Sequence, residues 1–214
     1  LGAVDASVGG KTGIDFDGHK NQVGVFAEPS ATYVPRHAFS TRPRGQLLSG
    51  FGEVLKTAYI GSPELLPQLL ETEALNPEAM AKTVATCLRV KSESVEKDRY
   101  EHGLRKVLNL GHTAGHAIET LSGYRIAHGH AVAIGLAIMA RAFCRDAAEI
   151  EAALTKLGLP TRTEFSPERL AQAALADKKR AGERITLVIP RAIGDCVLRE
   201  VPVDTLADIF ERGM

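Results

Sequence analysis

The chain has 214 residues, of which 44% are hydrophobic and 24% are charged, which is ordinary for a globular protein. Its 26 Lys and Arg residues balance its 26 Asp and Glu residues, so net charge favours neither a nucleic acid nor a membrane surface as partner. The longest apolar run, 131–140, is too short to cross a bilayer. Cys87, Cys144 and Cys196 are far apart and odd in number, which argues against a disulfide framework and suits a reducing cytoplasm.

Residues 1 to about 40 are rich in Gly, Asp, Ser and Pro, which favours loops over long regular elements. Two short stretches with β-branched and aromatic residues, 22–26 and 31–34, predict strands within this segment. The chain opens on Leu1 without an initiator Met, in a stretch typical of the interior of a domain. We therefore expect a fragment of a longer protein.

From about Pro43 onward the spacing of apolar residues becomes helical. Asn76-Pro77 and Ser166-Pro167 are typical helix starts, because proline is favoured at the first helical position. The predicted helices cover roughly residues 43–60, 63–72, 77–98, 106–122, 130–144, 146–157, 166–178 and 203–212, and a β-hairpin is predicted from 185–189 and 196–201. The predicted fold is mainly α: a multihelical domain with a short N-terminal β/loop segment and a small C-terminal hairpin.

Polar residues occupy the segment 105–119 at the spacing that a buried helix normally gives to its apolar residues. Arg105, Asn109, His112, His116 and Glu119 follow at intervals of 4, 3, 4 and 3, while the other faces are apolar. On one helix these side chains would share a face, so we expect them to line an internal cavity. A single histidine on such a helix is commonly structural, but two at i and i+4 beside Arg and Asn favour a site.

A histidine and a carboxylate elsewhere in the chain extend this pattern. His128 precedes the apolar run, and the dipole at a helix start disfavours a cation there, which leaves the neutral imidazole that binds metals. Glu53 and Lys56 share a helix face in an apolar segment. They could form an ion pair on the surface, or Glu53 could be buried, in which case its carboxylate needs a partner such as a metal. Two or three imidazoles with one carboxylate make a zinc site with an open position.

The segment SVGGKT, residues 7–12, is not a phosphate loop, since Asp5 stands where that motif requires glycine. Its backbone amides and Lys11 suit contact with an anion, and an exposed lysine on a Gly-rich turn is the alternative. By sequence alone, Lys91 and the pair Lys178-Lys179 are more typical of solvated lysines.

Five separated motifs together resemble the 3-dehydroquinate synthase family: VDASVGGKTGID, GFGEVLKTA, GLRKVLNLGHTAGHAIE, HGHAVAIGL and ALADKK. They occur in order and span nearly the whole chain. The resemblance implies an enzyme of the shikimate pathway that uses a divalent metal (Zn²⁺, or another ion such as Co²⁺) and NAD. It would cyclise 3-deoxy-D-arabino-heptulosonate 7-phosphate to 3-dehydroquinate with loss of phosphate. Residues 1–42 would be the trailing segment of an NAD-binding α/β domain whose remainder is missing, and 43–214 a helical zinc- and substrate-binding domain.

Position by position, the resemblance also implies the roles of the site residues. It gives Glu53, His112 and His128 as metal ligands, and it gives His116 as the group that moves a proton between substrate and water. The residues at the NAD or substrate edge would be Asp5, Lys11, Lys20, Asn21 and Thr41. The substrate pocket would hold Lys56, Lys91, Arg105, Asn109, His116 and Lys178 or its neighbour Lys179.

The chain departs from the family pattern at His130, where the family usually has Glu beside a metal ligand, and at His19, where it usually has Gly. The first change bears on the tuning of the metal through its outer shell. A related sugar-phosphate cyclase, a metal-dependent polyol dehydrogenase and a catalytically incomplete zinc-binding module stay open as alternatives, whereas a zinc peptidase would need Glu at Thr113. A sugar-phosphate ligand, a homodimer and a cytoplasmic location are expected, without nucleic acid or membrane.

Overall fold

The computed structural model describes residues 2–16, 19–71, 76–176 and 183–214. Lys178 and Lys179 lie outside these residues, and for Lys20 and Asn21 only the backbone is described. The site roles expected for these four residues therefore stay predictions.

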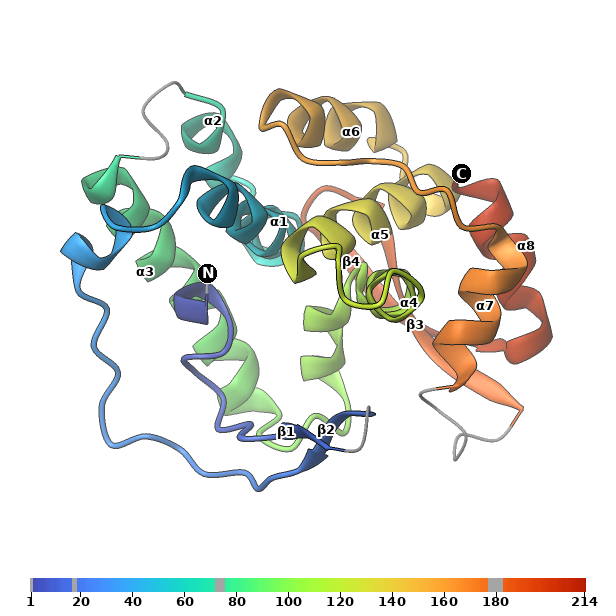
Figure 1. Cartoon of the computed structure of the whole chain (residues 1–214), viewed down its shortest axis with the longest axis horizontal. Helices are drawn as coiled ribbons and strands as arrows, with labels where there is room; N and C mark the ends of the chain where they lie inside the picture. Colours follow the sequence, from blue (N-terminus) through green and yellow to red (C-terminus); the bar gives the residue numbers. More distant parts are fainter. Residues whose placement is uncertain (1, 17–18, 72–75, 177–182) are drawn as a thin grey trace.

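Helices dominate the described chain (Figure 1). The α-helices are α1 (Arg44–Gly61), α2 (Leu65–Leu69), α3 (Pro77–Lys97), α4 (His112–Leu121), α5 (His128–Phe143), α6 (Ala147–Lys156), α7 (Pro167–Ala176) and α8 (Leu206–Arg212). Short 3-10 helices lie at η1 (Gly2–Val4), η2 (Arg36–Phe39), η3 (Leu104–Asn109) and η4 (Val203–Thr205). Two antiparallel hairpins pair β1 (Ile14–Phe16) with β2 (His19–Val23) and β3 (Arg184–Ala192) with β4 (Asp195–Pro202). The predicted fold class is confirmed, and none of the described helices has the length and apolarity to cross a membrane.

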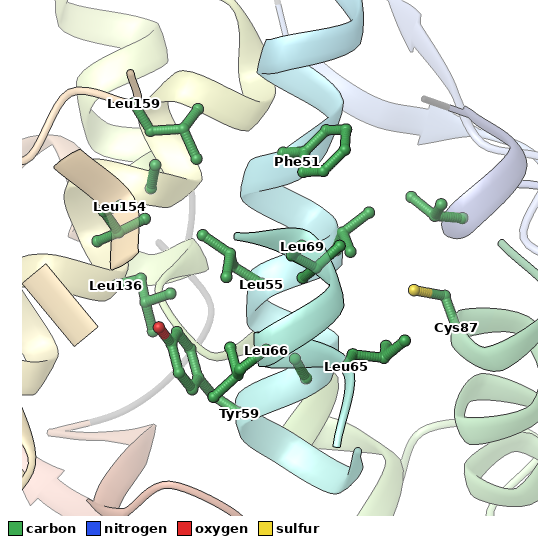
Figure 2. Packing of buried hydrophobic residues seen from close by; sticks show 14 of the residues in the cluster. Phe51, Leu55, Tyr59, Leu65, Leu66, Leu69, Cys87, Leu136, Leu154 and Leu159 are labelled. Carbon is green, nitrogen blue, oxygen red and sulfur yellow. The ribbon is translucent and has the colours of Figure 1, made fainter. Parts of the chain in front are cut away.

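Helix α5 is the centre of the molecule. Its residues 131–140 are all buried, the pattern of a helix that is apolar on every side. Helices α1, α4, α6 and α8 and strand β3 surround it. One side of α5, including Leu136, packs into a core with α1, α2, α3 and α6 (Figure 2). The other side, including Ile134 and Ile138, packs into a second core with α4, α7, α8 and β3. Helix α5 thus joins two hydrophobic cores.

Local sequence signals explain where several helices begin. The Asn76 side chain accepts a hydrogen bond from the Glu78 amide at 2.8 Å, and Pro77 is the first residue of α3. This is the N-cap followed by proline that the sequence predicts. Helix α7 begins at Pro167 after Ser166, as predicted, and its predicted end at residue 178 lies outside the described residues.

The predicted continuous helix over 106–122 is wrong. The segment forms two helices, η3 and α4, separated at Gly111, whose φ is +77°. A left-handed residue ends one helix and redirects the chain, and glycine adopts this conformation without steric cost. Gly111 also lies against α5, because an added Cβ would stand 2.8 Å from the Leu136 nitrogen. Arg105 and Asn109 therefore do not share one helix with His112.

Smaller differences also have local causes. Residues 31–34 form no strand, because no neighbouring strand within the described residues pairs with them. Helix α2 begins at Leu65 rather than at the predicted residue 63, since Pro67 has no amide to donate to the Pro63 carbonyl, and its predicted end at residue 72 lies outside the described residues. The C-terminal hairpin is longer than predicted: its strands continue past a register irregularity at Pro190 to a tight turn at Gly194, whose φ is +80°.

Helices α1 and α5 cross at two glycines. A Cβ on Gly52 would collide with the Gly129 carbonyl, and a Cβ on Gly129 would collide with the Ser49 carbonyl. Without these two side chains the helix backbones come into direct contact. Glu53 follows Gly52 and His128 precedes Gly129, so the crossing brings these two polar residues together.

We predict that Gly52→Ala destabilises the protein by about 2 kcal/mol or more, because a methyl group between two rigid backbones forces the helices apart. Gly45→Ala is the matched control in the same helix, since nothing lies within 4 Å of a Cβ at that position. The control should be neutral or stabilising by up to about 1 kcal/mol, the helix propensity of Ala over Gly. Urea unfolding measures both free energies. Equal effects of the two substitutions would contradict the crossing.

Candidate metal centre and its cationic pocket

Three ligand-type side chains converge from three helices. Glu53 lies within α1, His112 is the first residue of α4, and His128 is the first residue of α5. The Glu53 Oε1 atom lies 3.3 Å from His112 Nε2 and 3.1 Å from His128 Nε2. One ligand atom from each of the three lies within 4.8 Å of the other two. The structure thus brings together the three residues expected to bind the metal.

The Glu53 carboxylate has close neighbours but no well-formed hydrogen bond. Two histidine nitrogens approach Oε1, and Lys56 Nζ lies 2.6 Å from Oε2, yet neither oxygen accepts a hydrogen bond of acceptable geometry from the described residues. Buried polar atoms are normally hydrogen-bonded, and Glu53 is only 4% exposed. Ligand atoms that point at one common position suit a cation there. One carboxylate and two imidazoles fit a divalent metal with an open coordination position.

Charged neighbours set the protonation of these groups. Burial raises the pKa of Glu53, but Lys56 and His112 outweigh this effect and hold the pKa well below its usual range. Burial lowers the pKa of Lys56, and Glu53 more than offsets it, so the pKa of Lys56 is raised. The surface ion pair considered from sequence is therefore wrong: Glu53 and Lys56 are a buried, charged pair.

His128 is not kept neutral by its position at a helix start. Burial lowers the pKa of His128, but its contacts with the Glu119 and Glu53 carboxylates raise it to about 9. Two nearby carboxylates outweigh the helix dipole, whose effect is typically below about 1 kcal/mol. A metal ion that binds His128 must therefore displace a proton from the ring.

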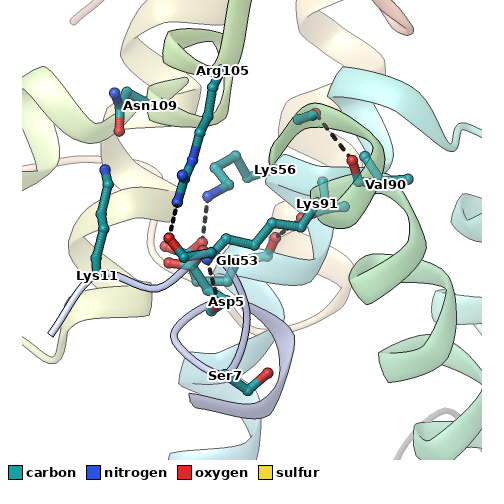
Figure 3. A network of polar contacts seen from close by, with 12 residues as sticks. Asp5, Ser7, Lys11, Glu53, Lys56, Val90, Lys91, Arg105 and Asn109 are labelled. Atoms are coloured by element: carbon teal, nitrogen blue, oxygen red, sulfur yellow. Dashed lines mark hydrogen bonds and ion pairs between the residues drawn. The ribbon is translucent and has the colours of Figure 1, made fainter. Parts of the chain in front are cut away.

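A cavity of about 640 Å³ is lined by His112 and His128, whose Nε2 atoms contact Glu53. Its expected site residues come from the N-terminal segment, α1, α3, η3, α4 and α5. Figure 3 shows those of the first four segments. They are Asp5, Lys11, Lys56, Lys91, Arg105, Asn109, His112, His116 and His128. Four cations line the cavity, and this charge suits an anionic ligand.

Lys91 joins the N-terminal segment to α3. Its Nζ lies 2.5 Å from Asp5 Oδ1 and also donates to the Asp5 backbone carbonyl (Figure 3). Lys91 is 8% exposed, so the solvated lysine that is typical of its sequence is wrong. Burial raises the pKa of Asp5, but Lys56 and Lys91 bring it below its usual value. Burial lowers the pKa of Lys91, and its ion pair with Asp5 opposes this effect beside the candidate metal centre.

Arg105 connects two loops at the wall of the cavity. Its Nη1 donates to the Arg99 carbonyl at 2.5 Å and its Nη2 donates to the Gly9 carbonyl at 2.8 Å. The side chain is buried, so these bonds fix the guanidinium rigidly at the cavity wall. Arg105 therefore has a structural task besides any contact with a ligand.

Glu101 is a cavity residue that the sequence analysis missed. It pairs with Lys11 and accepts a hydrogen bond from Asn109 Nδ2 at 2.6 Å. Its φ is +60°, which is uncommon for a residue other than glycine. The Asp98 carboxylate holds this loop by accepting bonds from the amides of His102 and Gly103. No periodic pattern marks such a loop in the sequence.

Two other residues of interest lie away from the cavity wall. Thr41 is exposed and its hydroxyl donates to the Ala38 carbonyl at 3.4 Å, so it does not line the cavity. His130 lines a separate hollow with Ile134 and Pro160. His116 does line the cavity, with its ring centroid 5.2 Å from that of His112.

We predict that Lys11 is unusually acidic. Burial and the nearby Arg105 and Lys91 lower its pKa to about 8, despite its ion pair with Glu101. Below pH 8 the ammonium is charged, and as pH rises through 8 the reactive amine forms. Competitive acylation followed by mass spectrometry should give half-maximal reactivity of Lys11 near pH 8, against about 10.4 for an ordinary lysine. Half-maximal reactivity near the ordinary value would contradict this arrangement of cations.

Comparisons with known proteins agree along the chain. The family model for the 3-dehydroquinate synthase C-terminal region matches residues 50–180, and that for the N-terminal region matches residues 1–49. The chain is 44% identical to the 3-dehydroquinate synthase of Thermococcus kodakarensis, over 99% of this chain and 61% of the relative. It is 38% identical to that of Pyrococcus abyssi, over 98% of this chain and 64% of the relative.

A solved structure shows the same arrangement of elements. The 2-epi-5-epi-valiolone synthase of Streptomyces hygroscopicus, solved with NAD⁺ and Zn²⁺ bound, is 25% identical, with a TM-score of 0.86 over 99% of this chain and 62% of that protein. The chain therefore spans somewhat less than two thirds of the length of these relatives. Because the two family models together match residues 1–180, the chain belongs to the 3-dehydroquinate synthase family.

Proposed function

We propose that this chain supplies the metal- and substrate-binding part of a 3-dehydroquinate synthase. Such an enzyme converts 3-deoxy-D-arabino-heptulosonate 7-phosphate to 3-dehydroquinate and releases phosphate. The observation that carries the proposal is the convergence of Glu53, His112 and His128, because both histidines line a cavity that four cationic side chains also line. A substrate with a phosphate and a carboxylate needs both features, and the proposed location is the cytoplasm.

The metal proposed for the site is zinc, held by Glu53, His112 and His128. When bound, the ion polarises a hydroxyl or carbonyl group of the substrate. The related valiolone synthase was solved with Zn²⁺, which supports this choice. Glu53 is ionised and buried, so it supplies the negative charge that retains a dication.

The cationic side chains are proposed to bind the two anionic groups of the substrate. Lys11, Lys91 and Arg105 line the cavity, and so does Asn109, whose amide is a hydrogen-bond donor held by Glu101. Lys56, already paired with Glu53, keeps that carboxylate charged and in place. Lys178 belongs to the same proposed set. Charge-assisted bonds of this kind are the strong ones in phosphate and carboxylate recognition.

His116 is the proposed proton carrier. It lies one turn beyond His112 on α4 and lines the cavity, so it can exchange a proton between a bound hydroxyl and water. Its ring centroid is 5.9 Å from that of His128, so the proposed proton carrier lies beside the proposed metal ligands.

NAD is the second proposed cofactor, and most of its site is proposed to lie in an α/β domain outside this chain. Asp5, Lys11, Lys20, Asn21 and Thr41 would contact its edge, with residues 1–42 as the trailing segment of that domain and 43–214 as the helical domain. Among the described residues both sheets are antiparallel hairpins, whereas dinucleotide sites of the Rossmann kind use a parallel sheet. A homodimer is proposed for the whole enzyme.

A related sugar-phosphate cyclase is the second candidate, because the valiolone synthase superposes over nearly the whole chain. The higher identity to 3-dehydroquinate synthases, 44% against 25%, favours the first proposal. Arg105 and Asn109 on one cavity wall suit a substrate carboxylate and its neighbouring hydroxyl. A catalytically incomplete zinc-binding module is the third, and turnover by the full-length protein distinguishes it.

We predict that the full-length protein releases phosphate from the heptulosonate phosphate only when NAD and a divalent metal are present, and that this chain alone releases little or none. His112→Ala should lower turnover by at least about 100-fold, because it removes one of three metal ligands. His37→Ala is the control, since His37 lies in η2 outside the cavity. A colorimetric phosphate assay measures all four proteins: the full-length protein, this chain alone and the two variants. Full activity of His112→Ala, or turnover of sedoheptulose 7-phosphate instead, would contradict the proposal.

A further inference from the structure

Glu119 is a buried carboxylate in an apolar part of α4. It is 4% exposed, and its neighbours Ala117 and Ile118 belong to the second hydrophobic core. Its Oε2 atom lies 3.1 Å from Nδ1 of His128. The Glu119 backbone carbonyl accepts bonds from the Ser122 hydroxyl at 2.9 Å and from the Tyr124 amide at 2.8 Å, which fixes the residue at the end of the helix.

Both metal-ligand histidines are held in the same manner. His112 Nδ1 lies 3.2 Å from the Leu110 carbonyl, and His128 Nδ1 lies 3.1 Å from the Glu119 carboxylate. In each ring the other nitrogen, Nε2, faces Glu53. A neutral imidazole carries one N–H, so an acceptor at Nδ1 places the hydrogen there and leaves the Nε2 lone pair for a metal.

The two rings differ in how firmly packing holds them. The His112 side chain is 10% exposed, whereas the His128 side chain is 41% exposed. Surrounding side chains therefore restrict the His112 rotamer, but they leave one side of His128 open to solvent. For His128 a strong acceptor at Nδ1 replaces the missing packing, and a carboxylate binds an N–H more strongly than a carbonyl does.

We propose that Glu119 is a positioning residue of the metal centre: it orients the His128 ring and fixes its tautomer, so that Nε2 points at the ion bound by Glu53 and His112. The inference rests on the proposed function, because it needs a metal at that position. Helix α4 then contributes to the metal centre twice. It provides His112 as a ligand at its start, and near its end it provides Glu119, which orients the second ligand His128.

One other arrangement uses the same atoms. His116, Glu119 and His128 each offer a ligand atom within 4.8 Å of the others, so Glu119 would be a direct ligand if a second ion bound there. The two roles predict different stoichiometries. A positioning residue changes the affinity for one ion, whereas a ligand of a second ion changes the number of ions bound.

Titration with Co²⁺, followed by its visible absorption, tests the role of Glu119 without any enzyme assay. Wild type should bind one equivalent, and Glu119→Gln, which keeps the size of the side chain, should weaken that binding about 10- to 100-fold and alter the absorption spectrum. Glu151→Gln is the matched control: it also removes a carboxylate that pairs with a side chain of α5, Arg141, but far from the site. The control should bind Co²⁺ as wild type does.

A second measurement does not depend on a folded variant. In wild type loaded with Zn²⁺, ¹⁵N shifts of the His128 ring should show Nδ1 protonated and Nε2 bound to metal. Binding through Nδ1, or equal Co²⁺ affinity of Glu119→Gln and wild type, would overturn the inference and leave the proposed function standing. A second Co²⁺ equivalent that only Glu119→Gln loses would overturn it too. Failure of wild type to bind any Co²⁺ would overturn the proposed function itself.

Discussion

The direct contact between the backbones of α1 and α5 at Gly52 and Gly129 is the constraint on which the site depends. Glycine at both positions lets two helices approach without side chains between them. Each glycine is the chain neighbour of a proposed metal ligand, Glu53 or His128. Gly111 precedes His112 and places it in a similar way, since its left-handed conformation turns the chain against α5 just before α4 begins. The three side chains converge because the backbones that carry them, at α5, in α1 and at the start of α4, lie in direct contact.

Such close packing puts several charges in a small and mostly buried volume, and the protein compensates for this by pairing them. Lys56 pairs with Glu53, Lys91 with Asp5 and Lys11 with Glu101. An unpaired buried charge would cost several kcal/mol, which is a large part of the stability of a domain. The pairs also position the cations. A ligand with two anionic groups therefore meets lysines and an arginine that are already fixed at the wall, which reduces the entropy lost on binding.

Much of the helical framework and the composition of the cavity could be predicted from sequence, because both depend on local patterns. The continuous apolar run of α5 and the Asn76-Pro77 start of α3 identify those helices directly. The break at Gly111 could not be predicted so easily, since a glycine within a helical period is tolerated when no neighbouring backbone requires a turn. Its cause, the approach of α5, is a tertiary contact. Arg105 and Asn109 were expected on the same helix face as His112, and they reach the same cavity from a different helix.

The burial of Lys91 and the role of Glu101 also lay beyond sequence reasoning. A lysine in a mixed helix is most often solvated, and only the packing of Asp5 from the other end of the chain makes Lys91 an internal cation. Glu101 lies in an irregular loop with no period to interpret, and its partners Lys11 and Asn109 come from two other segments. Such contacts between distant segments depend on the whole fold rather than on any local pattern.

The central claim is that α1, α4 and α5 together hold one metal ion. Anomalous diffraction at the zinc edge from crystals of the zinc-loaded chain tests it most directly. We expect one strong anomalous peak, within coordination distance of a Glu53 carboxylate oxygen, His112 Nε2 and His128 Nε2, which for zinc is about 2.0–2.2 Å. A peak bound by other residues, or none at these three side chains, would contradict the account.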